Sequence, residues 1–81
     1  MTKHNKVYYQ LLAARSEAAF LLGWIRAIEA FNRKLEHLKD RYPNQSDTLD
    51  FAMRENKLEI QELHEERAYW LDKLDVITDE S

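Results

Sequence analysis

Residues Ala18–Phe31, with the sequence AAFLLGWIRAIEAF, form the stretch that decides the fold of this chain. Eleven of these fourteen residues are apolar, and the exceptions are Gly23, Arg26 and Glu29. If the stretch is helical, its apolar side chains point in every direction around the helix, which is typical of a helix that is buried on more than one side. The rest of the chain is too short to bury it completely. The stretch therefore indicates the centre of an assembly.

Length and composition limit the possible folds further. The sequence has 81 residues, with one glycine, one proline and no cysteine, so we expect a single domain over residues 1–81 with few turns and long elements. The lack of cysteine excludes disulfides and cysteine-based metal sites, and we expect a cytoplasmic protein. Arg26 and Glu29 interrupt an apolar run that is shorter than the roughly 20 residues a bilayer requires, so we expect no membrane span.

Helical periodicity begins near Lys6 and continues to Tyr42, with apolar residues at alternating spacings of three and four. The first stripe consists of Val7, Leu11, Ala14, Ala18, Leu21, Ile25, Ile28, Leu35 and Tyr42. Asn32 and Lys39 are its polar interruptions. The pattern predicts a helix over about residues 5–41, which ends before Pro43 because the residue before a proline is disfavoured in the α region.

A second stripe follows a short polar loop at residues 42–46 and predicts a helix over about residues 47–77. It consists of Leu49, Met53, Ile60, Leu63, Trp70, Leu74 and Ile77, with Asn56 and Arg67 as polar interruptions. Ser46 or Asp47 is suited to cap the start of this helix.

The short loop forces the two helices to run antiparallel side by side. Residue i then lies opposite roughly residue 89 − i, which brings Asn32 next to Asn56 and Ala18 next to Trp70. The net charge of −3 divides into +4 for residues 1–45 and −7 for residues 46–81. In the hairpin the basic start of the first helix (Lys3, Lys6) lies beside the acidic end of the second (Asp72, Asp75, Asp79). We therefore predict an all-α, antiparallel, coiled-coil-like two-helix hairpin.

A second set of side chains lies on the first helix, opposite its stripe. The predicted dimer interface consists of Leu12, Ser16, Ala19, Phe20, Gly23, Ala27 and Ala30. Glycine in mid-helix costs about 1 kcal/mol relative to alanine, and a close crossing with another helix is one reason to tolerate it. We therefore expect a homodimer in which two hairpins cross near Gly23 and form a four-helix bundle. High helix propensity explains exposed alanines, but it does not explain Leu12, Phe20 and Gly23 together.

Residue patterns for chemistry are weak in this sequence. No glycine-rich phosphate loop and no nucleophile motif is present. His37 and His64 lack the partners at the spacing that metal sites require. We therefore assign no catalytic, cofactor-binding or metal-binding residue. Trp24, at the edge of the first stripe, is the candidate for a surface that contacts a protein partner.

An acidic run on the second helix supports an alternative. It consists of Glu59, Glu62, Glu65, Glu66, Asp72 and Asp75. Two Glu-x-x-Glu spacings followed by Asp-x-x-Asp resemble the metal-binding helices of all-α nucleotide pyrophosphohydrolases. The resemblance implies a metal-dependent enzyme whose carboxylates converge on hard cations such as Mg²⁺. The chain is short for that family and lacks clear substrate-binding helices, and acidic residues at helical spacing are common on solvated faces.

The sequence favours a small non-enzymatic protein–protein interaction module, namely an adaptor, regulator or inhibitor that acts through helix faces. The metal-dependent enzyme is one alternative. Another is an acidic decoy that occupies the basic groove of a nucleic-acid-binding protein. Direct nucleic-acid binding is disfavoured by the net charge of −3, because proteins that bind nucleic acid usually carry a basic surface.

Overall fold

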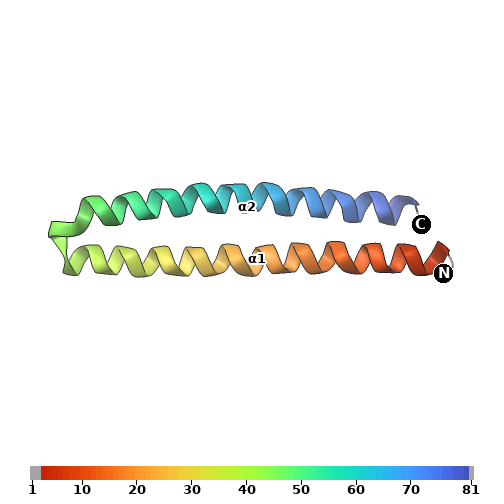
Figure 1. The fold of residues 1–81 in the computed structure, drawn as a ribbon, viewed down its shortest axis with the longest axis horizontal. Helices are drawn as coiled ribbons and strands as arrows, with labels where there is room; N and C mark the ends of the chain where they lie inside the picture. The colour runs from red at the N-terminus through yellow and green to blue at the C-terminus, as the bar shows by residue number, and fades with distance from the viewer. Residues whose placement is uncertain (1–2, 81) are drawn as a thin grey trace.

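The chain folds into two long antiparallel helices joined by a tight connection (Figure 1). The computed structural model describes residues 3–80, and the side chains of residues 6–78. Helix α1 spans Lys3–Arg41, a 3₁₀ turn η1 spans Pro43–Gln45, and helix α2 spans Ser46–Glu80. The predicted all-α hairpin is confirmed. Both helices extend further at their free ends than the expected limits of 5 and 77.

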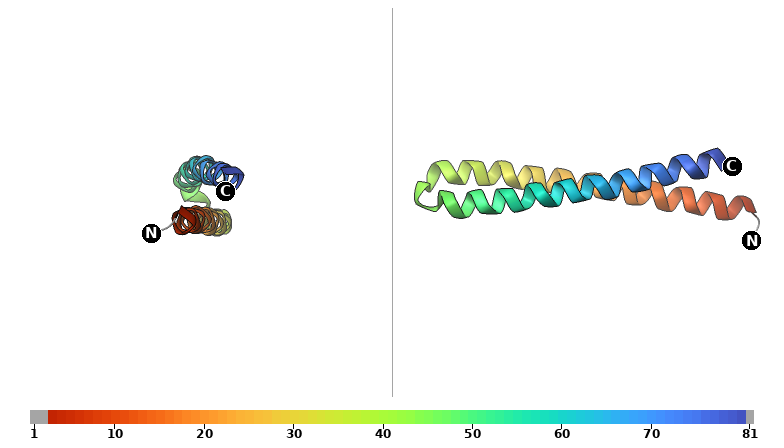
Figure 2. Two further views of the ribbon diagram at one scale, coloured as in Figure 1. Left: turned by 90° about the vertical axis from the view of Figure 1, so that its right-hand side faces the viewer. Right: turned by 90° about the horizontal axis from the view of Figure 1, so that it is seen from above.

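The hairpin is a rod with extents of 62 × 15 × 14 Å. Its connection lies at one end, and the start of α1 and the end of α2 lie at the other (Figure 1). Seen from above, the helices cross at a shallow angle near the middle of the rod (Figure 2). This crossing is the geometry expected when apolar residues repeat every 3.5 positions and the contacting stripe winds around each helix.

The core is a single line of side chains between α1 and α2. The buried apolar residues are Ala14, Ala18, Leu21, Ile25, Leu35, Met53 and Leu63. All of them belong to the two stripes predicted from the sequence. Leu21, Ile25 and Leu63 form the centre of this core, with Ile28, Ile60 and Trp70 packed against it. A hairpin of this kind buries one stripe on each helix and leaves the other faces exposed.

The register of the hairpin follows from two polar contacts. The side-chain amide of Asn56 donates a hydrogen bond to Oδ1 of Asn32 at 2.8 Å. The Lys39 Nζ atom lies 2.8 Å from a carboxylate oxygen of Asp50. The residue numbers sum to 88 and 89 in these two pairs, which agrees with the register predicted from the loop length. The predicted Asn32–Asn56 layer is therefore confirmed.

The connection differs from the prediction in two places. Tyr42 was expected on the buried stripe, but it is 54% exposed. It follows the last residue of α1 and has φ −128° and ψ 71°, so its side chain leaves the helical face. Ser46 or Asp47 was expected to cap α2. Ser46 adopts helical φ and ψ itself, its N–H bonds to the carbonyl of Pro43, and Asp47 follows it inside the helix. An N-cap needs non-helical φ and ψ, so η1 replaces a side-chain cap here.

The start of α1 lies beside the end of α2, as predicted, but the described side chains at this end form no ion pair (Figure 1). Among the side chains of residues 6–78, Lys39 and Asp50 form an ion pair, and this pair lies near the connection. Lys6 makes no ion pair with Asp72 or Asp75, and Lys3 and Asp79 lie outside the side chains that the structure describes. Within the described residues, neither helix contains a stretch long and apolar enough to cross a membrane.

Candidate functional site

The face of α1 that points away from the core carries the predicted interface residues. Leu12 is 48% exposed and Phe20 is 64% exposed. Ser16, Ala19, Gly23 and Ala27 are exposed as well, and Ala30 is half-buried. Helix α2 therefore leaves this face open to another molecule. Association through these residues stays a prediction.

Gly23 has no role in packing within the hairpin. A Cβ atom added to Gly23 would meet no other heavy atom within 4 Å. The φ of Gly23 is not positive either, so its backbone does not require glycine. Nothing inside the hairpin explains the cost of a glycine in mid-helix.

Trp24 is placed where the sequence predicted it, at the edge between the core and the open face. Its side chain is 43% exposed. The ring of Phe20 packs against it edge to face, with ring centroids 5.9 Å apart and planes inclined by 68°. Aromatic pairs in this geometry contribute about 0.5–1.5 kcal/mol beyond their buried area. The two rings thus form a partly ordered apolar surface on α1.

The polar interruptions of the two stripes have different surroundings. Asn32 and Asn56 satisfy each other, and the Asn32 amide also donates to the Met53 carbonyl at 3.4 Å. Arg67 is half-buried. Its Nε atom is buried and has no hydrogen-bond partner among the described residues. The first pair fixes the register, as polar residues do in coiled coils. Arg67 leaves an unsatisfied donor on the helix stripe.

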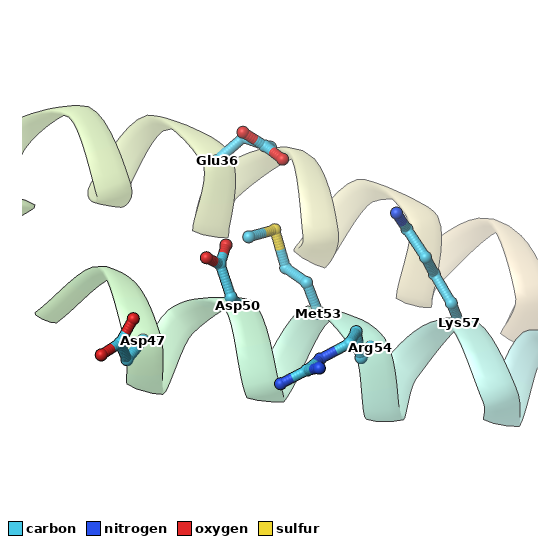
Figure 3. A pocket seen from close by; sticks show the side chains of 6 residues that line it. All are labelled: Glu36, Asp47, Asp50, Met53, Arg54 and Lys57. Atoms are coloured by element: carbon cyan, nitrogen blue, oxygen red, sulfur yellow. The ribbon is translucent and has the colours of Figure 1, made fainter.

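A groove of about 400 Å³ lies near the connection, on the side of the hairpin where Lys39 pairs with Asp50. Its lining residues are Glu36, Asp47, Asp50, Met53, Arg54 and Lys57. Asp50 and Met53 rise from α2 toward α1, whereas Arg54 lies along α2 in the direction of Asp47 (Figure 3). The hydrogen bond and charge of Asp50 raise the pKa of Lys39 above its usual 10.5. The charged groups of this groove have both signs and do not point to one centre.

The acidic run of α2 does not assemble a cation site in the described part of the chain. No three side chains of His, Asp or Glu in that part converge closely enough to hold a metal ion. Glu62, Glu65 and Glu66 are exposed and Glu59 is half-buried. The acidic residues follow the outer side of a single helix, and α1 offers no matching acidic cluster.

A second groove, of about 490 Å³, lies at the open end of the hairpin and was not predicted. Its lining residues are Gln10, Ala13, Ala14, Tyr69, Trp70, Lys73, Val76 and Ile77. The ammonium of Lys73 lies 5.6 Å from the centroid of the Tyr69 ring. The signal in the sequence is the pair Ala13-Ala14, whose small side chains leave space beside the large residues of α2. Predicting the groove would have required knowing which residues of α2 lie opposite Ala13-Ala14, in addition to the apolar stripe of α1.

Comparison with known proteins gives no further guide to the site. No family model matches the chain, and no curated protein and no solved structure is detectably similar to it.

Proposed function

We propose that this chain is a small non-enzymatic protein–protein interaction module, an adaptor, regulator or inhibitor that acts through helix faces. The observation that carries the proposal is the row of large apolar side chains exposed along α1. They are Leu12, Phe20, Trp24, Phe31 and Leu38, which are 37% to 64% exposed. Exposed apolar surface is typical of protein-binding sites when it is extensive, because single proteins rarely expose large apolar patches to water without a partner.

The proposal includes a homodimer as the resting form and a further protein partner that contacts Trp24. A second α1 helix that crosses near Gly23 would cover Leu12 and Phe20, while Trp24 and most of α2 would stay accessible. The net charge of −3 is unfavourable for binding the phosphate backbone, so the partner is taken to be a protein rather than nucleic acid. A cytoplasmic location is part of the proposal, and the cysteine-free composition is compatible with it.

The test begins with the mass in solution at micromolar concentration, measured by light scattering on a sizing column. The proposal expects a mass near twice 9.7 kDa. A photo-crosslinking amino acid is then placed at position 24 in cells, with position 61 as the control, because Gln61 is exposed on α2. A protein that is crosslinked at position 24 and not at position 61 is identified and purified. Its affinity is then measured for the original chain and for the Trp24→Ala variant. The proposal expects a loss of at least about 2 kcal/mol for this variant.

Two results contradict the proposal. One is a monomer that gives the same adducts at positions 24 and 61, because the apolar row would then attract nothing specifically. The other is a rise in melting temperature when Mg²⁺ or Mn²⁺ is added, because a cation that binds the folded state stabilises it. That result would favour the metal-dependent alternative on the acidic helix.

A further inference from the structure

A third stripe runs along α1, beside the core stripe. Its apolar members are Ala13, Phe20, Trp24, Ala27, Phe31 and Leu38, and Glu17 and Lys34 occupy its two remaining positions. The eight residues, called the lateral stripe here, alternate at spacings of three and four, as the core stripe does. All eight are exposed in the hairpin. The regular spacing and the exposure together mark a seam that fits another helix.

The lateral stripe faces one side of the hairpin and not α2 itself. Its centre lies two heptad positions around the helix from the core stripe, which is about 100°. A helix on the lateral stripe would therefore pack on α1 without displacing α2. The face centred on Gly23 lies further round, about 180° from the core stripe. The two faces of α1 are adjacent and share Phe20 and Ala27. Substitutions at Gly23, Glu17 and Lys34, which belong to one face only, separate them.

The lateral stripe is complementary to itself when it is reversed. Two copies of α1 can run antiparallel so that the numbers of paired residues sum to 51. Each residue of the lateral stripe then lies opposite one of complementary size or charge. Phe20 meets Phe31, and Trp24 meets Ala27, so aromatic packs on aromatic and large packs on small. Glu17 meets Lys34, which pairs opposite charges twice in a two-fold dimer. A parallel arrangement would instead place Glu17 on Glu17, Lys34 on Lys34 and Trp24 on Trp24.

The groove at the open end supports this register. In the antiparallel pair, Leu38 of the second copy lies opposite Ala13. Ala13 lines the groove of about 490 Å³, together with Tyr69 and Val76. Leu38 is 37% exposed in the hairpin, so its side chain is free to enter this groove. The two ends of the lateral stripe thus provide an apolar side chain and a recess for it.

The exposed area of the hairpin is also large enough for such a contact. A compact protein of 9.7 kDa exposes about 5,100 Å², whereas this chain exposes 6583 Å². The excess of about 1,500 Å² is larger than the roughly 800 Å² that each partner buries in a standard interface.

We infer that a second copy of the chain docks on the lateral stripe, with the two α1 helices antiparallel and the two-fold axis between Ile25 and Arg26. The inference rests on the proposed homodimer and specifies its face, direction and register. It moves the contact from the face centred on Gly23 to the adjacent face, which carries the aromatic residues, so the second copy itself is the partner that covers Trp24. The α2 helices then lie on the outside of the assembly.

The test uses charge reversal in the full chain. Glu17→Lys and Lys34→Glu each turn two attractive pairs per dimer into repulsive ones. We expect the dimer Kd, measured by sedimentation equilibrium, to rise roughly tenfold for each variant. An equimolar mixture of the two variants restores both attractive pairs, so it should form a heterodimer with nearly the original Kd. Glu29→Lys is the matched control, because Glu29 is exposed and lines a groove on the opposite side of the hairpin.

Each other outcome overturns the inference in a distinguishable way. If the original chain is monomeric at tens of micromolar, the seam and the proposed homodimer both fail. If it is a dimer that neither reversal weakens, while Gly23→Leu does, the homodimer stands and the lateral stripe is wrong. If Glu29→Lys weakens the dimer as much as the two reversals do, the effect is not specific to the lateral stripe and the register is wrong. Far-UV circular dichroism of each variant verifies that the helices are intact.

Discussion

Replacement of Gly23 by alanine tests how open the outer face of α1 is. In the hairpin, an added Cβ meets no heavy atom within 4 Å. The substitution therefore costs no steric energy and gains the difference in helix propensity, which is about 0.8–1.0 kcal/mol. Part of this gain arises in the unfolded chain, where alanine has less conformational freedom to lose than glycine. The structure thus predicts that Gly23→Ala stabilises each hairpin by about 1 kcal/mol.

Thermal unfolding followed by far-UV circular dichroism is the assay. For a domain of this size, 1 kcal/mol corresponds to a shift of about 4–8 °C in Tm. Both proteins are compared at one concentration, because the Tm of an associating protein depends on concentration. Ala19→Gly is the matched control. Ala19 is exposed on the same helix, so its replacement should lower Tm by about the amount that Gly23→Ala raises it.

The reasoning is refuted if Gly23→Ala lowers Tm, or leaves it unchanged, while Ala19→Gly lowers it. The control would then show that helix propensity acts normally in this part of α1. Another molecule, most simply a second copy of α1, would have to approach the backbone at Gly23 closely enough to exclude a methyl group. The contact would then lie on the face centred on Gly23 and not on the lateral stripe.

Three further predictions concern the hairpin itself. Leu63→Ala should cost about 2–5 kcal/mol in chemical denaturation, because Leu63 is 6% exposed in the core; Leu58→Ala, at a position that is 56% exposed, should cost less than about 1 kcal/mol. Asn32→Leu leaves the amide of Asn56 without its partner and should cost about 1–3 kcal/mol, whereas the double replacement by leucine should recover most of that loss; equal stability of the single and double variants would contradict this pairing. The pKa of Lys39 is raised in the folded state by its hydrogen bond to a carboxylate and by the charge of that group, so its contribution to stability is complete at neutral pH and is lost as the pH rises through that raised pKa. As the pH is raised through the alkaline range, the free energy of unfolding of Lys39→Met should therefore fall less steeply than that of the original chain.

The hairpin was predictable because its signals are local and redundant. The alternating spacing of Leu21, Ile25 and Ile28 predicts the buried face of α1, and the structure confirms it. The loop length then fixes the register, and the hydrogen bond between Asn32 and Asn56 confirms it. Each of these inferences needs only helix geometry and the position of one proline.

The two misses at the connection arise from backbone geometry within a few residues. Tyr42 continues the spacing of the stripe, but the helix ends one residue before it. Ser46 has the residue type of an N-cap, yet the 3₁₀ turn at Pro43–Gln45 already leads the chain into α2. Residue type does not distinguish a cap from the first helical position when the preceding turn is itself helical.

The candidate interaction site was only partly predictable. The sequence showed that Phe20 and Trp24 lie outside the core stripe, and both are indeed exposed. The groove beside Ala13 depends on the distance between two helices and on the large residues of α2, which no single stretch of sequence contains. A periodic pattern identifies apolar faces, but it does not indicate which molecule covers them.

The position of the connection at one end of the rod has a consequence for the order of folding. Lys39 and Asp50, the ion pair near the connection, are 11 residues apart in sequence. Ala14 and Ile77, which line the same groove at the open end, are 63 residues apart. Closing the longer loop directly costs about 1.5 kcal/mol more chain entropy than closing the shorter one. The helices should therefore pair first beside Pro43 and join progressively toward the open end, so folding proceeds as a zipper. Substitutions near the connection should then slow folding, and substitutions near the open end should mainly speed unfolding.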